Sequence, residues 1–247
     1  MIITVSNQKG GTGKSTTAAA IVQGATFKGK KVLAIDLDPQ CNLSFILGAN
    51  PLDVGAHQLI SGELSPIQTI QTTSLCSIVS GSYKLAESDT LLKGDKRLYA
   101  VKEAVKAFRD RFDLIVVDTP PTLGTLLINA LTASDKVLIP MQADVLSMQG
   151  LFQLCDTIKN VQSKYNPDLQ TAGIFFTRHN GRTVVAREAV EAITDKAQQW
   201  GIPVLKTFIR DGVAIKEAQM LRENLFEYAP KSKPAQDYLS LINEISI

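Results

Sequence analysis

The sequence predicts an α/β fold with three layers, in which a mostly parallel, twisted sheet is covered by helices on both faces. Two observations predict it: short apolar runs recur along the chain, and segments with helical spacing of apolar residues lie between them. Apolar strands that alternate with amphipathic helices form parallel sheets that are buried on both faces. Ligands of such folds bind beyond the carboxyl ends of the strands, so the functional residues are expected there.

Seven runs are expected to form the strands, because they are short, apolar and bounded by turn residues. They span residues 2–6, 31–36, 77–79, 114–118, 136–140, 172–177 and 204–208. Between residues 95 and 111, apolar residues recur at intervals of three and four, which places them on one face of a helix. These residues are Leu98, Val101, Val105 and Phe108. A further helix is expected after residue 182, with Val185, Ala189 and Ile193 facing inward, and it should end near Gly201.

Composition and length favour an ordinary globular chain and a single domain over residues 1–247. The chain is 45% hydrophobic and 20% charged, with a net charge of +2 and no repeat or flexible linker. Its apolar runs are far shorter than the roughly 20 residues that cross a bilayer, and its start does not resemble a secretory signal. Three cysteines lack both metal-ligand spacing and an even count, so a reducing cytoplasm is expected.

A glycine-rich turn joins the first expected strand to the helix after it. Glycines at positions 10, 11 and 13 let backbone N–H groups approach phosphate oxygens, and the helix N-terminus adds its positive dipole end. Lys14 can reach the β- and γ-phosphates, and the Ser15 hydroxyl can bind Mg²⁺. The predicted nucleotide contacts in this loop are Lys9, Gly10, Gly11, Thr12, Gly13, Lys14, Ser15 and Thr16.

This loop departs from the usual eight-residue pattern, because Gln8 stands where the pattern has its first glycine. Lys9 directly precedes the glycines. Its charge alone fits two roles equally well, a contact with a phosphate or a solvated side chain beside the anion site. The position of Gly-Lys-Ser between a strand and a helix nevertheless predicts phosphate binding.

Acidic residues follow two other expected strands. Asp36 and Asp38 share one face of an extended segment, where such a pair suits a metal's water shell or an attacking water. Asp118 ends an apolar strand and can hold a water on Mg²⁺. Alternatively, Asp36 caps the turn that follows it, and Asp118 caps the next helix.

The segment 9–15, KGGTGKS, resembles the deviant phosphate loop of the ParA/MinD class of P-loop ATPases. DLDPQ at 36–40 is similar to the second acidic motif of that class, and the likeness continues through residues 119–124, 129–135, 138–141, 149–151 and 181–183. The resemblance implies that Lys9 reaches across a dimer to phosphates in the other subunit, and that Asp38 orients the hydrolytic water. It also implies that catalysis needs Lys14 and that Ser15, Asp36 and Asp118 surround Mg²⁺.

The pattern is most similar to ParA/Soj-type partitioning ATPases of the short form, without an N-terminal helix-turn-helix, since the first strand begins at residue 2. The resemblance implies an ATP sandwich dimer in the cytoplasm, associated with the nucleoid, that binds DNA without sequence preference. A ParB-like partner would stimulate hydrolysis so that a DNA cargo is segregated. Thr177 and Arg210 would contact the nucleotide base.

Basic residues in the carboxyl half would contact DNA in such a protein. Ala214 stands at a position that is often basic in the family, so other residues are expected to share this task. The predicted DNA contacts are Arg182, Arg187, Lys206, Arg210 and Lys216. Segments 84–111 and 178–233 each carry a net charge of +3, which is compatible with a positive surface but equally with solvated helices.

Three alternatives remain. A MinD-like ATPase would act on a membrane or protein cargo, but the segment after Lys233 has two acids and no basic residue, which argues against a basic membrane helix. A metabolic ligase or electron-transfer protein could use the same loop, although Cys76 and Cys155 lack the paired context of a cluster. A scaffold with little turnover would be favoured if Asp38 were dispensable.

Overall fold

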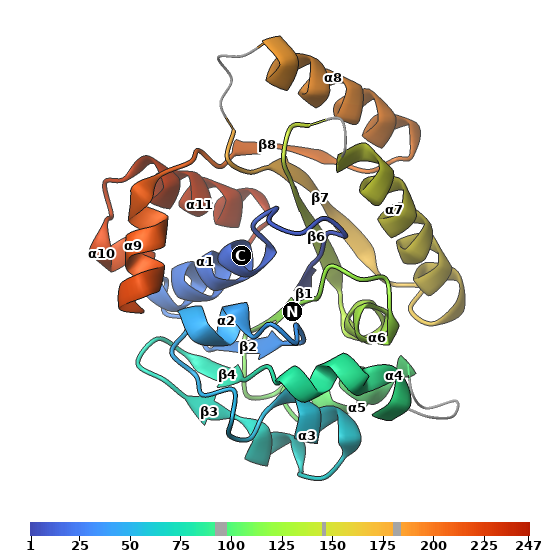
Figure 1. Cartoon of the computed structure of the whole chain (residues 1–247), viewed down its shortest axis with the longest axis vertical. Coiled ribbons are helices and arrows are strands. Elements are labelled where there is room, and N and C mark those ends of the chain that lie inside the picture. The colour runs from blue at the N-terminus through green and yellow to red at the C-terminus, as the bar shows by residue number, and fades with distance from the viewer. Residues whose placement is uncertain (92–97, 145–146, 180–183) are drawn as a thin grey trace.

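The computed structural model describes residues 1–91, 98–144, 147–179 and 184–247. An eight-stranded sheet runs through it in the order β3-β4-β2-β5-β1-β6-β7-β8 (Figure 1). Neighbouring strands are parallel, except that β3 is antiparallel to β4 at one edge. The strands are β1 (Ile2–Val5), β2 (Val32–Asp36), β3 (Gln71–Thr72), β4 (Ser77–Val79), β5 (Leu114–Asp118), β6 (Lys136–Met141), β7 (Gln170–Phe176) and β8 (Val204–Phe208). The predicted α/β fold with a mostly parallel sheet is confirmed.

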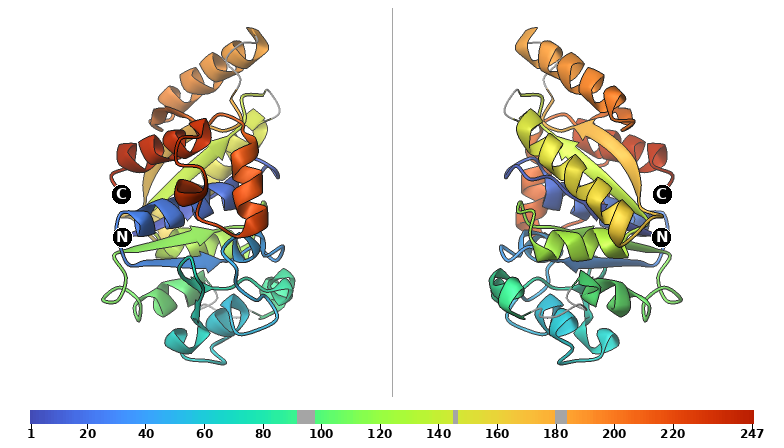
Figure 2. Two further views of the ribbon diagram at one scale, coloured as in Figure 1. Left: turned by 90° about the vertical axis from the view of Figure 1, so that its left-hand side faces the viewer. Right: turned by 90° about the vertical axis from the view of Figure 1, so that its right-hand side faces the viewer.

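Helices cover both faces of this sheet (Figure 2). On one face lie α1 (Lys14–Phe27), α2 (Asn42–Ile46), α9 (Val213–Leu221), α10 (Leu225–Tyr228) and α11 (Lys233–Glu244). The other face carries α3 (Ala56–Ser61), α5 (Ala100–Val105), α6 (Thr125–Ala133), α7 (Ser147–Lys164) and α8 (Val184–Gln199). The 3-10 turns η1 (Pro66–Thr69) and η2 (Tyr83–Glu87) and the short helix α4 (Ser88–Leu91) complete the described elements. None of the helices in the described ranges is long and apolar enough to cross a membrane.

The strand side chains divide between the two faces of the sheet, because successive side chains of a strand point to opposite faces. In β2, Val32 and Ala34 join the cluster around α1, whereas Leu33 and Ile35 join the cluster around α3 and α5. A third cluster lies between β6, β7 and helices α6 to α8. The near-continuous apolar character of the strands thus reflects burial on both sides.

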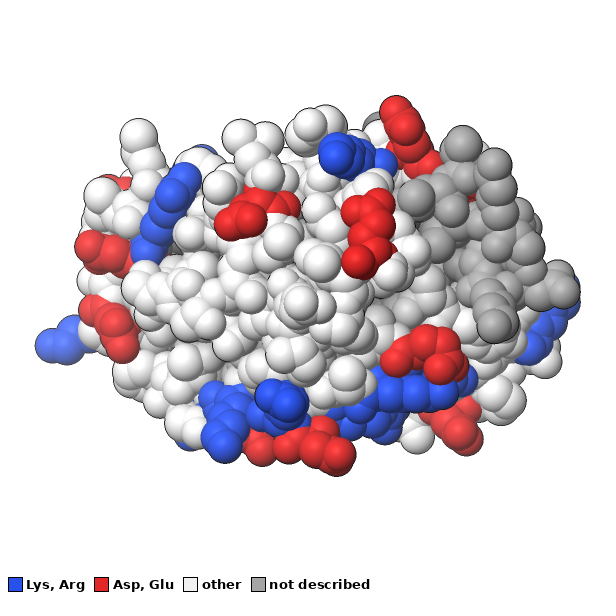
Figure 3. Space-filling view, turned by 90° about the horizontal axis from the view of Figure 1, so that it is seen from below, with Lys and Arg blue, Asp and Glu red and all other residues white. Residues whose placement is uncertain are grey.

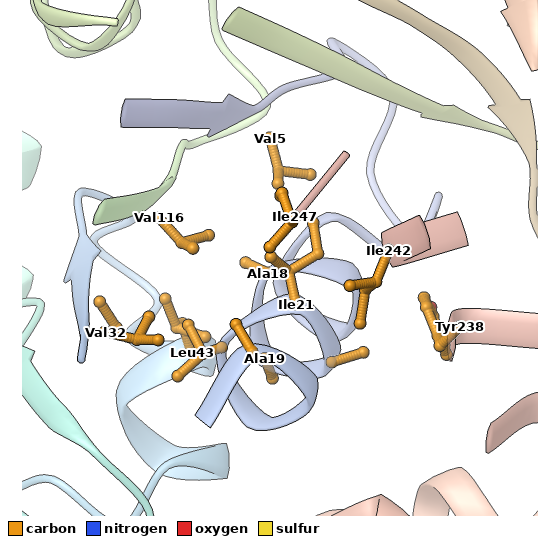
Figure 4. Close-up of a cluster of buried hydrophobic side chains, with 14 of the residues drawn as sticks. Val5, Ala18, Ala19, Ile21, Val32, Leu43, Val116, Tyr238, Ile242 and Ile247 are labelled. Carbon is orange, nitrogen blue, oxygen red and sulfur yellow. The ribbon is translucent and has the colours of Figure 1, made fainter. Parts of the chain in front are cut away.

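Helix α1 is enclosed on nearly all sides, which its small side chains allow. Figure 4 shows Ile21 of α1 between the strand residues Val5 and Val116 and the α11 residues Tyr238 and Ile242. A Cβ atom at Gly24 of α1 would collide with side chains of α10 and α11. The C-terminal helix is therefore a part of the core that also fixes the helix following the glycine-rich turn.

Three details of the sequence prediction need correction. Val185 is exposed (66%), because the first turn of α8 lies away from the sheet, and the inward line is Ala189, Ile193 and Ala197 (Figure 1). The regular part of the helix predicted between 95 and 111 is only α5, and β3 was not predicted. Strand β3 has two residues at a sheet edge and no apolar run, so no periodicity could show it.

Candidate functional site

The glycine-rich turn lies at the carboxyl edge of the sheet, between β1 and α1. Its backbone is left-handed at Gly11 (φ 76°) and at Gly13 (φ 88°), the residue that precedes the first turn of α1. Glycine adopts this conformation without the steric penalty of a Cβ atom. A Cβ at Gly10 or Gly11 would meet no atom within 4 Å, so the space facing the turn is open.

A cleft of about 440 Å³ opens at this turn. This volume falls in the range of small-molecule sites. The predicted residues that line the cleft are Gly10, Gly11, Gly13, Lys14, Ser15, Thr16 and Asp38. Residues from β1–α1 and from the end of β2, distant in sequence, therefore meet in one place as predicted for the carboxyl ends of parallel strands.

Lys14 is the cation at the base of this cleft. Only 7% of the residue is exposed, and its ammonium donates to the carbonyl oxygen of Lys9 over 3.3 Å. Burial lowers the pKa of Lys14, and the negative charges of Asp118 and Asp38 partly oppose that effect. A phosphate in the cleft would add negative charge beside Lys14 and so stabilise its charged form.

Asp118 is the carboxylate beneath the cleft. It is completely buried, and neither carboxylate oxygen accepts a hydrogen bond of ordinary geometry from the described residues. Burial and the nearby Asp36 raise the pKa of Asp118 well above its usual range, while the Ser15 hydroxyl and Lys14 favour its charged form. A buried carboxylate with unfilled oxygens next to a hydroxyl fits a divalent cation, so Ser15 and Asp118 suit Mg²⁺.

Asp36 lies beside Asp118 in the sheet register, but its oxygens are occupied. Oδ1 accepts the backbone N–H of Asp38 (3.0 Å), and Oδ2 accepts the backbone N–H (2.9 Å) and the hydroxyl (2.6 Å) of Ser44. Burial raises the pKa of Asp36 to about 6, and these hydrogen bonds oppose the rise. Asp36 is thus near the expected metal position, while its lone pairs serve the protein.

Asp38 faces the cleft with 5% of its surface exposed. Its Oδ1 accepts the backbone N–H of Gln40 at 2.9 Å, which fixes the orientation of the carboxylate. A fixed carboxylate that lines the same cleft as Lys14 can accept a hydrogen bond from a water molecule that attacks a phosphate.

Lys9 is not among the residues that line the cleft. Its ammonium lies 2.7 Å from Oδ2 of Asp144 and 3.3 Å from the hydroxyl of Ser147, and its side chain is 33% exposed. Although burial acts in the opposite direction, hydrogen bonds from Lys9 and Ser147 lower the pKa of Asp144. Within one subunit, Lys9 is therefore an ion-pair partner of the β6–α7 loop.

Thr177 and Arg210 line a second, smaller cavity beside the cleft. The Thr177 hydroxyl donates to the carbonyl of Thr12 at 2.8 Å, so it connects the end of β7 to the glycine-rich turn. Arg210 makes a bidentate pair with Asp237, through Nε at 2.9 Å and a terminal nitrogen at 2.5 Å. Its guanidinium is consequently held against α11 at the rim of this cavity.

The remaining basic residues come from consecutive elements. Arg187 on α8, Lys206 on β8 and Lys216 on α9 are exposed. Arg182 lies outside the described residues. Whether these side chains contact DNA remains a prediction.

Several lining residues of the cleft were not assigned a role from the sequence: Gln40, Asn42, Phe45, Ile46, Pro121, Arg178 and Gln219. Gln40 and Asn42 adjoin Asp38, so the acidic motif itself was a signal for them. Arg178 directly follows Thr177 and has a left-handed backbone (φ 49°), which is strained for a residue with a side chain. No sequence pattern predicts this conformation. Gln219 comes from α9 and only the fold brings it here.

Comparisons with known proteins identify the family of this chain. A family model described as an AAA domain matches residues 1–171. The chain is similar to the sporulation initiation inhibitor protein Soj of Bacillus subtilis (strain 168), at 34% identity over 99% of this chain and 98% of that protein. It is also similar to the chromosome-partitioning ATPase Soj of Treponema pallidum (strain Nichols), at 35% identity over 97% and 94% of the two chains.

Among solved structures, the chain is similar to one titled cobyrinic acid a,c-diamide synthase from Mycobacterium smegmatis, with a bound ATP analogue and magnesium. The TM-score is 0.87 at 32% identity, and the match covers 98% of this chain and 92% of that one.

Proposed function

This chain belongs to the ParA/Soj family of partitioning ATPases, and from that premise we propose that it acts as a Mg·ATP-dependent dimer that moves a DNA cargo. In this proposal the dimer binds DNA without sequence preference and associates with the nucleoid. A ParB-like partner bound to the cargo stimulates hydrolysis and so releases the ATPase from the DNA.

The observation that supports this proposal most is the arrangement of three functional groups around one cleft. Lys14 and Asp38 line the cleft, and Asp118 lies beneath it with unfilled oxygens. Lys14 and the glycine N–H groups would bind the phosphates, and Ser15 and Asp118 would hold Mg²⁺. When bound, the metal ion neutralises charge on the phosphate oxygens.

Asp38 would act on the attacking water. Its orientation is fixed by Gln40, so it can hold the water without a rearrangement at the moment of reaction. Binding of ATP needs Lys14 and the glycine N–H groups, whereas hydrolysis also needs Asp38. The two steps should therefore be separable by mutation.

Dimerisation would use Lys9. Its ammonium is half-exposed and paired with a single carboxylate, that of Asp144, so the phosphates of a second subunit can compete for it. An exposed ion pair contributes at most about 1 kcal/mol, which is a small barrier to such an exchange.

DNA contacts are proposed for α8, at one end of the molecule, and for β8 and α9 (Figure 1). Exposed basic residues there include Arg187, Lys206 and Lys216. The opposite end, formed by α3, β3 and α5, shows acidic and basic side chains side by side around a mainly uncharged centre (Figure 3). A mixed surface of this kind gives little attraction for a polyanion.

One specific observation favours a second candidate function. The similar Mycobacterium smegmatis structure is titled as an amide-forming synthase. Such a reaction would also consume ATP at the phosphate loop, and the nitrogen would come from ammonia or an amide donor. Loss of solvent raises the pKa values of the buried Cys41 and Cys155 and of the partly buried Cys76. An activated nucleophile that takes an amide nitrogen from a donor would need the opposite, a lowered pKa.

The variant Asp38→Asn tests the proposed function. We expect its affinity for Mg·ATP to stay within about threefold, its turnover to fall at least about 100-fold, and a dimer to accumulate with ATP. Calorimetry, phosphate release and light scattering measure these three quantities, with Asp110→Asn on the exposed surface as the matched control. Normal turnover by Asp38→Asn, or a corrinoid rather than DNA as the stimulating ligand, would contradict the proposal.

A further inference from the structure

We propose that Asp36 and Ser44 are positioning residues for hydrolysis, which brace the segment carrying Asp38 against the loop that follows β4. This inference rests on the role proposed above for Asp38. Asp36 would hold the protein backbone in place by accepting its N–H groups, and Ser44, which belongs to no sequence motif, would hold Asp36.

We call the hydrogen bonds that join Asp36, Ser44 and Gly81 the brace. It begins at the end of β2. The buried carboxylate of Asp36 accepts the N–H of Asp38 at 3.0 Å, and so fixes the main chain two residues further on. Its other oxygen accepts both the N–H and the hydroxyl of Ser44. A carboxylate has about four lone-pair positions, and these donors take three of them. Direct metal ligation by Asp36 would be limited to the one position that remains unless it displaced part of this network.

The brace continues to β4 through the Ser44 hydroxyl. This hydroxyl donates to Asp36 and accepts the N–H of Gly81 at 2.8 Å. A Cβ at Gly81 would lie 3.0 Å from the Asp36 carboxylate and 3.1 Å from the carbonyl oxygen of Asp38. The loop after β4 thus packs directly against both ends of the segment between Asp36 and Asp38.

Helix α2 connects this brace to the cleft. Its residues Asn42, Phe45 and Ile46 line the cleft, while Leu43 and Ser44 are buried on the opposite side. Removing the Ser44 hydroxyl would take away one of the two hydrogen bonds from Ser44 of α2 to Asp36 and leave the Gly81 N–H without its acceptor. The carboxylate of Asp38 would then lose its fixed position relative to Lys14, although no phosphate-binding group would be removed.

The experiment compares Ser44→Ala with Ser134→Ala, in which a buried hydroxyl that also makes two hydrogen bonds is removed far from the cleft. We expect Ser44→Ala to lower kcat at least about 10-fold, because a small misplacement of a catalytic group is costly. The Kd for ATP and the Mg²⁺ concentration needed for binding should change less than about twofold. Ser134→Ala should lower thermal stability with an unchanged kcat.

Two further readouts separate positioning from a general loss of structure. Amide hydrogen exchange in peptides that cover residues 36–47 and Gly81 should accelerate in Ser44→Ala, since the Gly81 N–H loses its acceptor and the Asp36 carboxylate, which accepts the N–H groups of Asp38 and Ser44, loses one of its donors. In the Asp38→Asn background, Ser44→Ala should add almost no loss of kcat, because the two act through the same carboxylate. If Ser44→Ala does not fold, Ser44→Cys keeps the volume and weakens the hydrogen bonds.

The outcomes are distinguishable. A normal kcat for Ser44→Ala together with a strong effect of Asp38→Asn overturns the brace and leaves the proposed function intact. If Ser44→Ala needs a higher Mg²⁺ concentration for ATP binding, the brace is overturned as well, because Asp36 would then act on the metal. It is also overturned if Ser44→Ala lowers kcat as much in the Asp38→Asn background as in the wild type, because Ser44 would then act through a group other than Asp38. Normal turnover by Asp38→Asn removes the proposed role of Asp38 and the brace together.

Discussion

At the scale of single residues, Lys14 is a buried cation whose charge faces an open cleft. Burial disfavours the charged form of Lys14, and the negative charges of Asp118 and Asp38 partly offset that effect. A side chain in such surroundings gains a strong electrostatic interaction when an anion enters.

We predict that Lys14→Ala reduces the affinity for Mg·ATP at least about 100-fold, since only backbone donors would remain for the β- and γ-phosphates. Isothermal titration measures the affinity. Lys31→Ala, at the opposite edge of the sheet, is the matched control and should bind normally. An unchanged affinity for Lys14→Ala would place the nucleotide elsewhere.

We predict that Lys9→Ala still binds ATP, within about threefold of the wild-type affinity, but stays monomeric. The variant loses only the pair with Asp144 within its own subunit, whereas a dimer would lose the contact with the partner's phosphates. Light scattering with ATP measures the mass, and Lys106→Ala, at the C-terminal end of α5, is the control. If Lys9→Ala forms a normal dimer with ATP, Lys9 has no role across the interface and is only a solvated cation beside the site.

The glycine-rich turn that lines the cleft could be predicted from the sequence because its geometry is local: a strand, three glycines and a helix follow one another. The occupied oxygens of Asp36 could not, since their donor Ser44 belongs to no motif, and its hydroxyl in turn accepts the N–H of Gly81 from the loop after β4. The pair of Lys9 with Asp144 likewise joins residues 135 positions apart.

At the scale of elements, α11 joins the core to the last strand of the sheet. Glu244 of α11 accepts the backbone N–H groups of Lys206 (2.7 Å) and Thr207 (3.0 Å) on β8. Although burial acts in the opposite direction, these hydrogen bonds and the charge of Lys206 lower the pKa of Glu244 below its ordinary value of 4.5. A carboxylate with a lowered pKa stabilises the fold above its unfolded pKa and loses that contribution as the pH falls.

We predict that Glu244→Gln lowers the free energy of unfolding by about 1 kcal/mol at pH 7, because the group is only partly buried. The difference from the wild type should shrink toward zero as the pH falls from 5 to 3. Denaturant titrations across this range measure it, with the exposed Glu227→Gln as control. A difference that persists unchanged at pH 3 would show that the charge of Glu244 contributes nothing.

The strands were predicted within two residues because burial on both faces makes them continuously apolar. The exposed Val185 was not foreseen, since helical periodicity gives the apolar face of a helix but not the point at which the helix leaves the sheet. Strand β3 has neither length nor apolar pattern, and only its pairing with β4 defines it.

At the scale of the whole molecule, the net charge of +2 is too small for one subunit to hold duplex DNA firmly. Each neutralised phosphate contributes about 0.9 to the salt dependence of binding, and several such contacts are needed. Two subunits held together by ATP would double the contacts without a second loss of translational entropy.

We predict that the double variant Arg187→Glu/Lys216→Glu weakens DNA binding for all sequences alike and lowers the salt dependence, while ATP binding survives. The control is Arg111→Glu/Lys164→Glu, which changes the net charge equally on exposed residues outside the predicted DNA contacts. Equal losses for both double variants would show that net charge alone sets the affinity.

The central claim is that ATP makes this chain a DNA-binding dimer, and fluorescence anisotropy with several unrelated duplexes, in ATP or ADP and across a salt series, tests it most directly. We predict tight binding with ATP, weak binding with ADP, similar affinity for every duplex and a steep loss of affinity as salt rises. Equal binding with both nucleotides, a strong preference for one duplex, or no binding in ATP at low salt would contradict it.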